Sequence, residues 1–301
     1  MRAVVTGGAG FIGSHLVDAL VARGDEVHVL DDLSSGKREN VLPDATLHEG
    51  DIRVDADRVF DAARPDVCFH LAAQASVTRS VQDPAFDADV NVIGTVRILE
   101  AARRHGAQVV FSSTGGAIYG ECEGPAPEDA PRRPLSPYGT SKLAGEEYLA
   151  AWNRLHGSGH VALRFGNVYG PRQDPHGEAG VVAIFLKTVA AGGTPRIFGD
   201  GGQTRDYVFA GDVVQAVLAS VGRNGGVFNV ATGVETSVTA LVEGMRAAVG
   251  RAFEVEHGEE RLGDLQRSVL DPSLAERGLG WRPETPLEDG LRATWDFFRG
   301  D

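Results

Sequence analysis

The sequence predicts an α/β fold built on a doubly wound parallel sheet. Short apolar runs alternate along the first half of the chain with segments of helical periodicity, as in repeated strand–helix–strand units. A glycine-rich turn separates the first apolar run from the first helical segment. The 301 residues, 42% of them hydrophobic, suffice for one large α/β unit or for two domains with a substantial core.

The individual elements follow from apolar periodicity and from start and stop signals. We expect strands at residues 3–5, 26–30, 67–71 and 108–112. We expect helices at residues 13–23, 84–105, 238–250 and 285–298. Gly24 ends the first of these helices, whereas Asp83 caps the second and Pro84 opens it. The segment from 166 to 206 is rich in Gly, Pro and Asp, which predicts loops lying over a site.

Charge and cysteine content exclude several classes of function. The formal net charge is −13, which argues against a nucleic-acid partner or an anionic membrane, because their phosphates would be repelled. Cys68 and Cys122 have neither a second cysteine nor a histidine nearby in sequence, so we expect no metal site and no disulfide. The chain begins directly with a strand and has no long apolar run, which favours a cytoplasmic protein.

The glycine-rich turn predicts a dinucleotide site. Gly8, Gly10 and Gly13 have the spacing G-x-G-x-x-G after a strand and at the start of a helix. Glycines allow the backbone to approach a pyrophosphate, and the helix N-terminus presents unpaired N–H groups to its charge. Asp31 closes the second strand, where a carboxylate accepts hydrogen bonds from ribose hydroxyls and repels a 2′-phosphate, which favours NAD over NADP. The alternative is a tight glycine turn that binds no ligand. The preceding strand, the following helix and Asp31 together disfavour this alternative.

The predicted architecture is therefore a Rossmann-type doubly wound parallel sheet with a smaller C-terminal α/β lobe that binds the substrate. Residues 1–165 are assigned to the NAD-binding domain. Residues 166–301 are assigned mainly to the substrate-binding lobe, with some segments returning to the first domain. Asp51 and Ile52 are candidates for the adenine edge, although a surface loop explains them nearly as well.

Tyr138 and Lys142 form the candidate acid/base pair. They are four residues apart, so a helix beginning near Ser136 would present both on one face. A free tyrosine has a pKa near 10, and we expect the lysine ammonium and a positive nicotinamide ring to bring that pKa toward neutrality. On spacing alone, the better interpretation is that Tyr138 is a half-buried residue with a packing role and that Lys142 is a solvent-exposed helix residue. The upstream dinucleotide signals reverse that preference.

These motifs identify a family resemblance. The chain resembles the extended short-chain dehydrogenase/reductases and, within them, the nucleotide-sugar epimerase/dehydratase branch. The resemblance covers nearly the whole chain, through motifs at residues 6–13, 31–33, 71–74, 91–95, 112–120, 138–142, 164–172, 205–207 and 261–264. It implies NAD as cofactor and a UDP-sugar as substrate. The implied reaction interconverts UDP-glucose and UDP-galactose through a transient 4-keto sugar.

The resemblance also assigns the cofactor contacts. The implied NAD-binding residues are Gly7, Gly10, Phe11, Ile12, Gly13, Asp31, Asp32, Ser35, Gly36, Asp51, Ile52, Leu71, Ala72, Ala73, Asn91, Ser112, Tyr138, Lys142 and Phe165. Among them, Asn91 matches a helix asparagine that organises the site, and its plainer interpretation is a buried polar residue.

The catalytic and substrate contacts are implied in the same way. Tyr138 would exchange the proton of the sugar O4, while Lys142 would hold the nicotinamide ribose. The catalytic hydroxyl is either Thr114 or Ser113, because the stretch that follows is one residue longer than the common pattern. The implied substrate residues are Asn167, Arg205 and Arg261 for the diphosphate, Val181 and Phe198 for the uracil, and Asp264 for the nucleotide ribose.

Several alternatives remain within and outside this family. A 4,6-dehydratase would carry an Asp-Glu pair after the catalytic threonine, where this chain has Gly115 and Gly116. A 4-epimerase of UDP-glucuronate or a UDP-N-acetylhexosamine is a nearer alternative, and Asp174 mildly favours a neutral sugar. An NAD-binding sensor or scaffold would not need Tyr138 and Lys142. The resemblance also implies a homodimer formed through helices 84–105 and 138–156.

Overall fold

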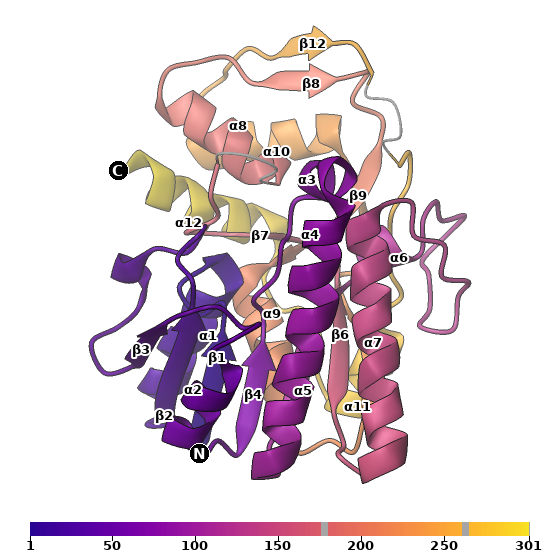
Figure 1. Ribbon diagram of the computed structural model, residues 1–301. Coiled ribbons are helices and arrows are strands. Elements are labelled where there is room, and N and C mark those ends of the chain that lie inside the picture. The colour runs from indigo at the N-terminus through magenta and orange to yellow at the C-terminus, as the bar shows by residue number, and fades with distance from the viewer. Residues whose placement is uncertain (176–179, 261–264, 301) are drawn as a thin grey trace.

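The computed structural model describes residues 1–175, 180–260 and 265–300. Its centre is a parallel sheet of seven strands in the order β10-β6-β5-β4-β1-β2-β3 (Figure 1). The strands are β1 (Arg2–Thr6), β2 (Glu26–Asp31), β3 (Thr46–Glu49), β4 (Val67–His70), β5 (Gln108–Thr114), β6 (Val161–Phe165) and β10 (Gly226–Val230). The predicted fold class is confirmed, and each of the predicted strands lies in this sheet.

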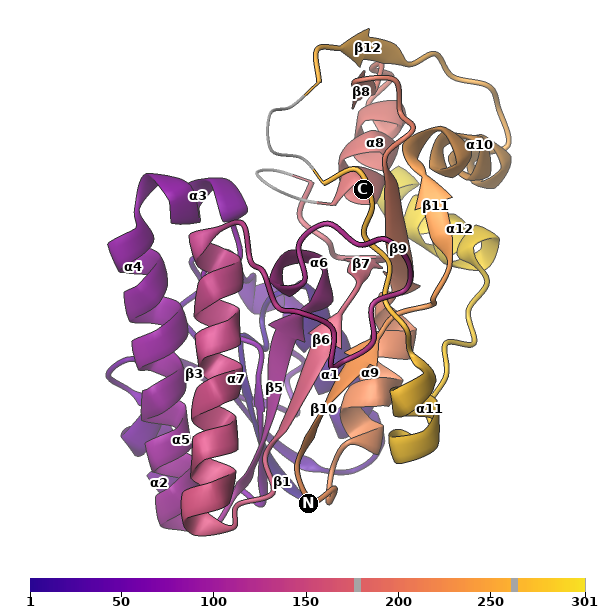
Figure 2. The same cartoon turned by 90° about the vertical axis from the view of Figure 1, so that its right-hand side faces the viewer.

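Helices cover both faces of the sheet, as Figure 2 shows. One layer contains α1 (Phe11–Ala22), α9 (Ala210–Ala219) and α11 (Ser273–Leu279). The opposite layer contains α2 (Ala56–Ala63), α5 (Gly94–His105) and α7 (Pro137–His156). Alternate residues of β1 supply the two cores: Val5 packs against the first layer and Val4 against the second.

The predicted long helix 84–105 is present but is not uniformly α-helical. It consists of α4 (Pro84–Ala88), a π-helical turn η2 (Asp89–Ile93) and α5. Asp83 caps it as predicted, since its carboxylate accepts a hydrogen bond from the Phe86 N–H. A short helix α3 (Val77–Gln82) precedes it. Because π-helical turns occur frequently at functional sites, this part of the helix is a candidate for a functional role.

A smaller lobe lies beyond the carboxyl ends of the strands, at the top of Figure 1. A three-stranded sheet, order β11-β9-β7, and a strand pair, β12-β8, belong to it. Its elements are β7 (Asn167–Tyr169), α8 (Val181–Ala190), β8 (Arg196–Phe198), β9 (Thr204–Phe209), β11 (Glu235–Ser237), α10 (Val238–Val249), β12 (Glu256–Gly258) and α12 (Leu287–Arg299). Tyr169, Leu241 and Leu291 lie in its core.

The prediction of loops for residues 166–206 is wrong in part. The segment contains β7, α8, β8 and the start of β9. Gly, Pro and Asp gather at the ends of these elements, whereas the apolar interior of α8 packs Phe185 and Leu186 into the core of the small lobe. β10 comes from residues after this segment and joins the edge of the main sheet beside β6.

The two cysteines and the hydropathy of the helices complete the description of the fold. Cys68 and Cys122 are both buried free thiols. Among the described residues, no helix is both long enough and apolar enough to cross a bilayer.

Candidate active site

The glycine turn between β1 and α1 is shaped for close approach to a ligand. Gly7 has φ +70°, and a Cβ on Gly13 would lie 2.0 Å from the Gly7 carbonyl oxygen, so neither position tolerates a side chain. Gly10 is the N-cap of α1 and offers no side chain to its first N–H groups. These donors remain available to an anion, so the turn fits the pyrophosphate of a dinucleotide.

Asp31 lies at the carboxyl end of β2 and braces this turn. Its side chain is 6% exposed, and its two oxygens accept hydrogen bonds from the Ala9 and Leu33 N–H groups, each at 2.9 Å. Burial raises the pKa of Asp31, and these two hydrogen bonds oppose the increase. Each oxygen keeps a second lone pair, so the carboxylate fits a ribose diol while it also holds the backbone.

The loop after β2 folds back over the glycine turn. Asn40, which sequence reasoning missed, donates its side-chain N–H to the Ala9 carbonyl at 3.0 Å. A Cβ on Gly36 would lie 2.8 Å from an Asp31 oxygen, which explains a glycine there. Asp32 accepts hydrogen bonds from the exposed Ser34 instead of contacting the turn.

Other predicted cofactor residues lie at the same edge of the sheet. Leu71, Ala72 and Ala73 directly follow β4, and Ser112 and Phe165 lie near the ends of β5 and β6. Ligands of open α/β sheets bind outside these carboxyl ends. Asp51 and Ile52 follow the end of β3 at the same edge, where Asp51 forms an ion pair with Arg53 and Ile52 is buried.

Tyr138 and Lys142 occupy successive turns at the start of α7. Ser136 caps that helix by accepting a hydrogen bond from the Gly139 N–H, and Pro137 opens it. The Lys142 side chain is 3% exposed, and its Nζ donates to the Ser112 carbonyl at 2.9 Å. Tyr138 is half-buried. Both side chains therefore lie beside the end of β5, and the helical spacing places them on one face of α7.

The electrostatics of the pair differ from the expectation. The pKa of Tyr138 is raised to about 12, first by burial and then by the charge of Asp87, while a hydrogen-bonding contact with Thr114 lowers it. Burial lowers the pKa of Lys142 to about 8, against the charges of Asp87 and Glu146. The chain's own residues thus favour the neutral phenol, because desolvation and the charge of Asp87 outweigh the hydrogen bond with Thr114.

The structure separates the two candidate hydroxyls. Ser113 is buried and donates its hydroxyl to Glu146 at 2.5 Å, on the side of β5 that faces α7. Thr114 is the next residue, half-buried, and its side chain contacts the Tyr138 phenol. The Ser113 hydroxyl is therefore engaged by Glu146, whereas the Thr114 hydroxyl contacts the phenol. The geometry supports Thr114 as the catalytic hydroxyl.

Asn91 joins two segments of the site. It lies in the π-helical turn and is 3% exposed. Its side chain accepts a hydrogen bond from the Gln74 N–H and donates one to the Gln74 carbonyl, both at 2.9 Å. Asn91 thereby fixes the chain directly after Ala73, at the end of β4.

The predicted substrate residues lie across the site, in the small lobe. Asn167 begins β7 and Arg205 lies in β9, and the register pairs Asn167 with Tyr207. Arg205 is two residues before Tyr207, so it shares a face of this sheet with Asn167. Val181 opens α8 and Phe198 ends β8. Arg261 and Asp264 lie outside the described residues.

Comparison with known proteins identifies the family. Residues 3–231 match the model of the NAD dependent epimerase/dehydratase family. The chain belongs to this family. NAD is accordingly its cofactor, and the glycine turn and Asp31 provide a site that fits it.

Similar members of the family match the chain from end to end. A UDP-glucose 4-epimerase of Mycolicibacterium smegmatis is 52% identical over 99% of this chain and 99% of its own length. The crystal structure of a Thermotoga maritima UDP-glucose 4-epimerase with UDP-glucose has a TM-score of 0.96 and 47% identity, covering 100% of this chain and 99% of that one. A Thermus thermophilus UDP-glucose 4-epimerase in complex with NAD has a TM-score of 0.94 and 48% identity, with the same coverage.

Two buried carboxylates around the pair escaped sequence reasoning. Glu146 lies one turn after Lys142 and bonds both Ser113 and Arg164. Asp87 lies in α4 and is fully buried. The position of Glu146, four residues after Lys142 on the same helix, is the signal that would have found it. For Asp87 the signal is weaker: it precedes Asn91 by one helical turn.

Proposed function

We propose that the protein is a nucleotide-sugar 4-epimerase that interconverts UDP-glucose and UDP-galactose. The observation that carries this proposal is the arrangement of Tyr138, Lys142 and Thr114 beside the dinucleotide edge of the sheet. The full-length similarity to UDP-glucose 4-epimerases supports the choice of substrate. Gly115 and Gly116 follow Thr114, so the acidic pair of a dehydratase is missing from its usual place.

The chain's own residues provide a proton path and a fixed orientation. Tyr138 takes the proton from the sugar O4 and later returns it, while the Thr114 hydroxyl orients the phenol by hydrogen bonding. Lys142 would present its ammonium group to the ribose of the cofactor. When bound, NAD supplies a reversible hydride acceptor and a positive charge that favours the phenolate. Gly7, Gly13 and Asp31 would hold it at the edge of the sheet.

The small lobe would hold the nucleotide. Arg205 and Asn167, on one face of the β7–β9 sheet, are assigned to the diphosphate, together with Arg261. Val181 and Phe198 are assigned to the uracil, and Asp264 to its ribose. Holding the nucleotide in one lobe and the cofactor in the other leaves the sugar at Tyr138, where orientation contributes much of the catalysis.

The decisive experiment offers the purified protein three substrates separately. UDP-glucose, UDP-glucuronate and UDP-N-acetylglucosamine are each incubated with NAD, and the products are resolved by NMR. Inversion at C4 of UDP-glucose supports the proposal. Inversion at C4 of another sugar alone would assign a different substrate to the same 4-epimerase reaction. No inversion of any sugar would overturn the assignment.

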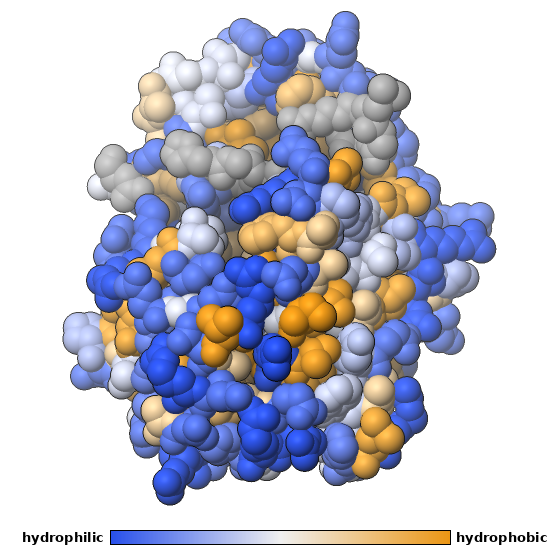
Figure 3. Space-filling model, viewed as in Figure 1, coloured by the Kyte–Doolittle hydropathy of each residue, from blue (hydrophilic) through white to orange (hydrophobic). Residues whose placement is uncertain are grey.

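We also propose that the enzyme is a cytoplasmic homodimer. The face formed by α3, η2 and α7 is viewed in Figure 3 and carries exposed apolar side chains. They are Val77, Val81, Ile93, Tyr148 and Leu155. Several exposed apolar groups on one face are consistent with an interaction surface. The two free thiols suit a reducing compartment. Light scattering of the purified protein and cell fractionation test the two statements.

A further inference from the structure

Asp87 is a buried carboxylate to which the proposed mechanism gives no task. Its side chain in α4 is 0% exposed. Its Oδ1 accepts hydrogen bonds from the side-chain amides of Gln74 at 2.9 Å and Asn91 at 3.0 Å. Its Oδ2 accepts one from the Ser141 hydroxyl at 2.5 Å. Such a carboxylate is fully supplied with donors, as burial of a charge requires.

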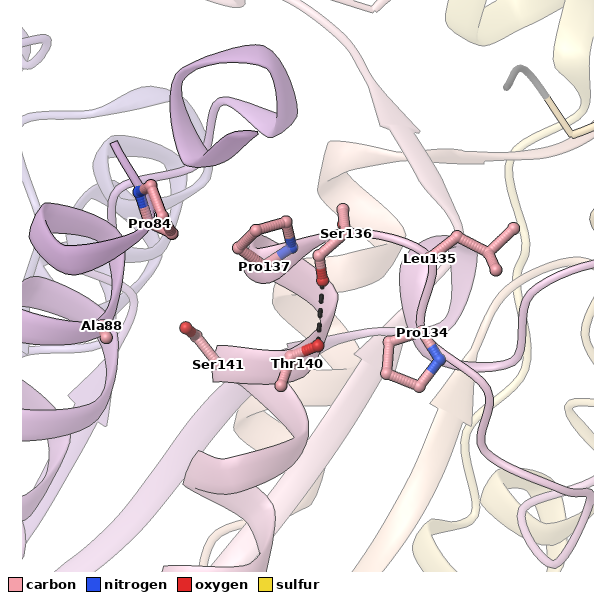
Figure 4. A pocket seen from close by; sticks show the side chains of 8 residues that line it. All are labelled: Pro84, Ala88, Pro134, Leu135, Ser136, Pro137, Thr140 and Ser141. Atoms are coloured by element: carbon pink, nitrogen blue, oxygen red, sulfur yellow. Dashed lines mark hydrogen bonds between the residues drawn. The ribbon is translucent and has the colours of Figure 1, made fainter. Parts of the chain in front are cut away.

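These three hydrogen bonds join the parts of the site that surround the acid/base pair. Ser141 lies on α7 between Tyr138 and Lys142, so its bond to Asp87 fixes the first turns of α7 against α4. Figure 4 shows Ser141 pointing from α7 toward α4, at one wall of a surface pocket of about 510 Å³. Gln74 and Asn91 extend the same connection to the end of β4.

The charge of Asp87 also acts on both members of the pair. It favours the ammonium form of Lys142 and the neutral form of Tyr138. Lys142 has one other carboxylate acting on it, Glu146 of the same helix. That second carboxylate is neutralised by the bidentate ion pair with Arg164.

The remaining elements around the pair supply little opposing charge. From β4, His70 faces Lys142, and burial lowers the pKa of His70 to about 3, so it is neutral at physiological pH. From β6 the charged group is Arg164, which the ion pair occupies. From α3, Arg79 stacks on the Phe86 ring at 4.2 Å. β5 contributes the Ser112 carbonyl and the Phe111 ring to Lys142.

We propose that Asp87 is a positioning residue that clamps the start of α7 through Ser141 and supplies the negative charge that keeps Lys142 cationic. The inference rests on the proposed function, because it assigns the cation a task in that reaction. A buried lysine without this carboxylate loses its proton more readily. Lys142 can donate its hydrogen bond to the Ser112 carbonyl both as an ammonium and as a neutral amine. At Lys142, Asp87 therefore controls the charge of the side chain and not its position.

The test titrates Lys142 directly. Besides Lys142, the lysines of the chain are Lys37 and Lys187, so selective ¹³C labelling of lysine gives a simple NMR spectrum. Each signal is assigned by its loss in the corresponding lysine-to-arginine variant. Asp87→Asn preserves the size and an oxygen acceptor while it removes the charge. We expect it to lower the titration midpoint of Lys142 by about one pH unit and to leave the other two unchanged.

Asp83→Asn is the matched control, because Asp83 is an exposed carboxylate at the cap of the same helix and asparagine caps equally well. It should leave the Lys142 midpoint in place. An unchanged midpoint in Asp87→Asn would overturn the electrostatic part of the proposal. The titration needs neither NAD nor sugar, so it remains decisive if the protein epimerises none of the sugars tested.

A second variant isolates the clamp. Ser141→Ala keeps the charge of Asp87 and removes its bond to α7, so we expect a lower kcat without a shift of the pH profile. Asp87→Asn should in contrast move the alkaline limb of the kcat profile to lower pH, because Lys142 deprotonates earlier. Wild-type kcat in Ser141→Ala would overturn the clamp. If Asp87→Asn does not fold, Ser141→Ala still decides that part. Asp87→Glu keeps the charge, so it should keep the Lys142 midpoint near the wild-type value, and a midpoint lowered as in an uncharged variant would contradict the electrostatic part.

Discussion

Arg164 and Glu146 form a bidentate ion pair inside the protein, with Nε–Oε1 and Nη2–Oε2 distances of 2.9 and 2.6 Å. Their side chains are 2% and 3% exposed. The remaining Nη1 of Arg164 donates to the Tyr119 hydroxyl and to the Glu128 carbonyl. The pair thereby connects β6, α7 and the loop that follows α6 (Gly115–Ile118), which carries the glycines after Thr114.

Breaking this pair should destabilise the whole protein. Arg164→Met would leave Glu146 buried without its partner, which costs about 3–5 kcal/mol in comparable cases. Urea unfolding followed by circular dichroism measures the loss. Arg299→Met is the control, since its partner Asp296 is 49% exposed and such pairs contribute little. Similar stability for both variants would contradict a structural role for the pair.

Removing the phenol hydroxyl should abolish turnover and spare binding. Tyr138→Phe leaves the ring packed but has no proton to exchange, so we expect kcat to fall by about 10²–10⁴-fold. NAD and UDP affinity, measured by calorimetry, should stay near the wild-type values. Tyr148→Phe, which changes an exposed tyrosine of the same helix, should retain full activity. A near wild-type rate in Tyr138→Phe would exclude it as the acid/base.

Asp31 should discriminate between the two dinucleotides. Asp31→Ala removes a ribose acceptor and the repulsion of a 2′-phosphate, so NAD affinity should decrease more than NADP affinity. Because Asp31 also holds Ala9 and Leu33, some weakening of both is expected. Fluorescence titration with each cofactor measures the two constants. Asp44→Ala, which changes an exposed carboxylate between β2 and β3, is the control. Equal loss for both cofactors would mean that Asp31 supports the turn without contacting the ribose.

The glycine turn should not accept a methyl group at Gly13. The added Cβ would lie 2.0 Å from the Gly7 carbonyl oxygen, so the turn must open and displace the first N–H groups of α1. We expect Gly13→Ala to lose NAD binding in an equilibrium titration. Gly124→Ala meets no atom within 4 Å and should bind NAD normally. Retained binding in Gly13→Ala would show that α1 shifts to accommodate the change.

Acid should destabilise the protein through His70. This histidine is held neutral between Thr6 and Thr95, and burial lowers its pKa from 6.5 to about 3. The unfolded chain binds the proton first, so stability decreases as the pH falls from 6.5 toward 3. His70→Gln keeps one donor and one acceptor but does not titrate, so its unfolding free energy should decline less steeply over this range. The exposed His257→Gln is the control, and the same slope in His70→Gln as in wild type would assign the acid sensitivity elsewhere.

Local sequence signals predicted much of the fold and part of the site. Asp83 and Ser136 begin their helices where capping residues are expected, because a cap depends on backbone donors two or three residues away. The glycine turn follows its strand for the same local reason. The helix α8 was missed because its stability comes from burial of Phe185 and Leu186 in the small lobe, which neighbouring residues do not reveal.

The sequence by itself determined the parallel sheet, the dinucleotide turn and the shared face of Tyr138 and Lys142, since these depend on periodicity and short-range hydrogen bonds. Tertiary structure alone decided that Thr114, and not Ser113, contacts the phenol. It also decided that Asp87 is buried near the pair and that the pKa of Tyr138 is raised. The physical reason is that desolvation and charge act through space, between segments that only folding brings together.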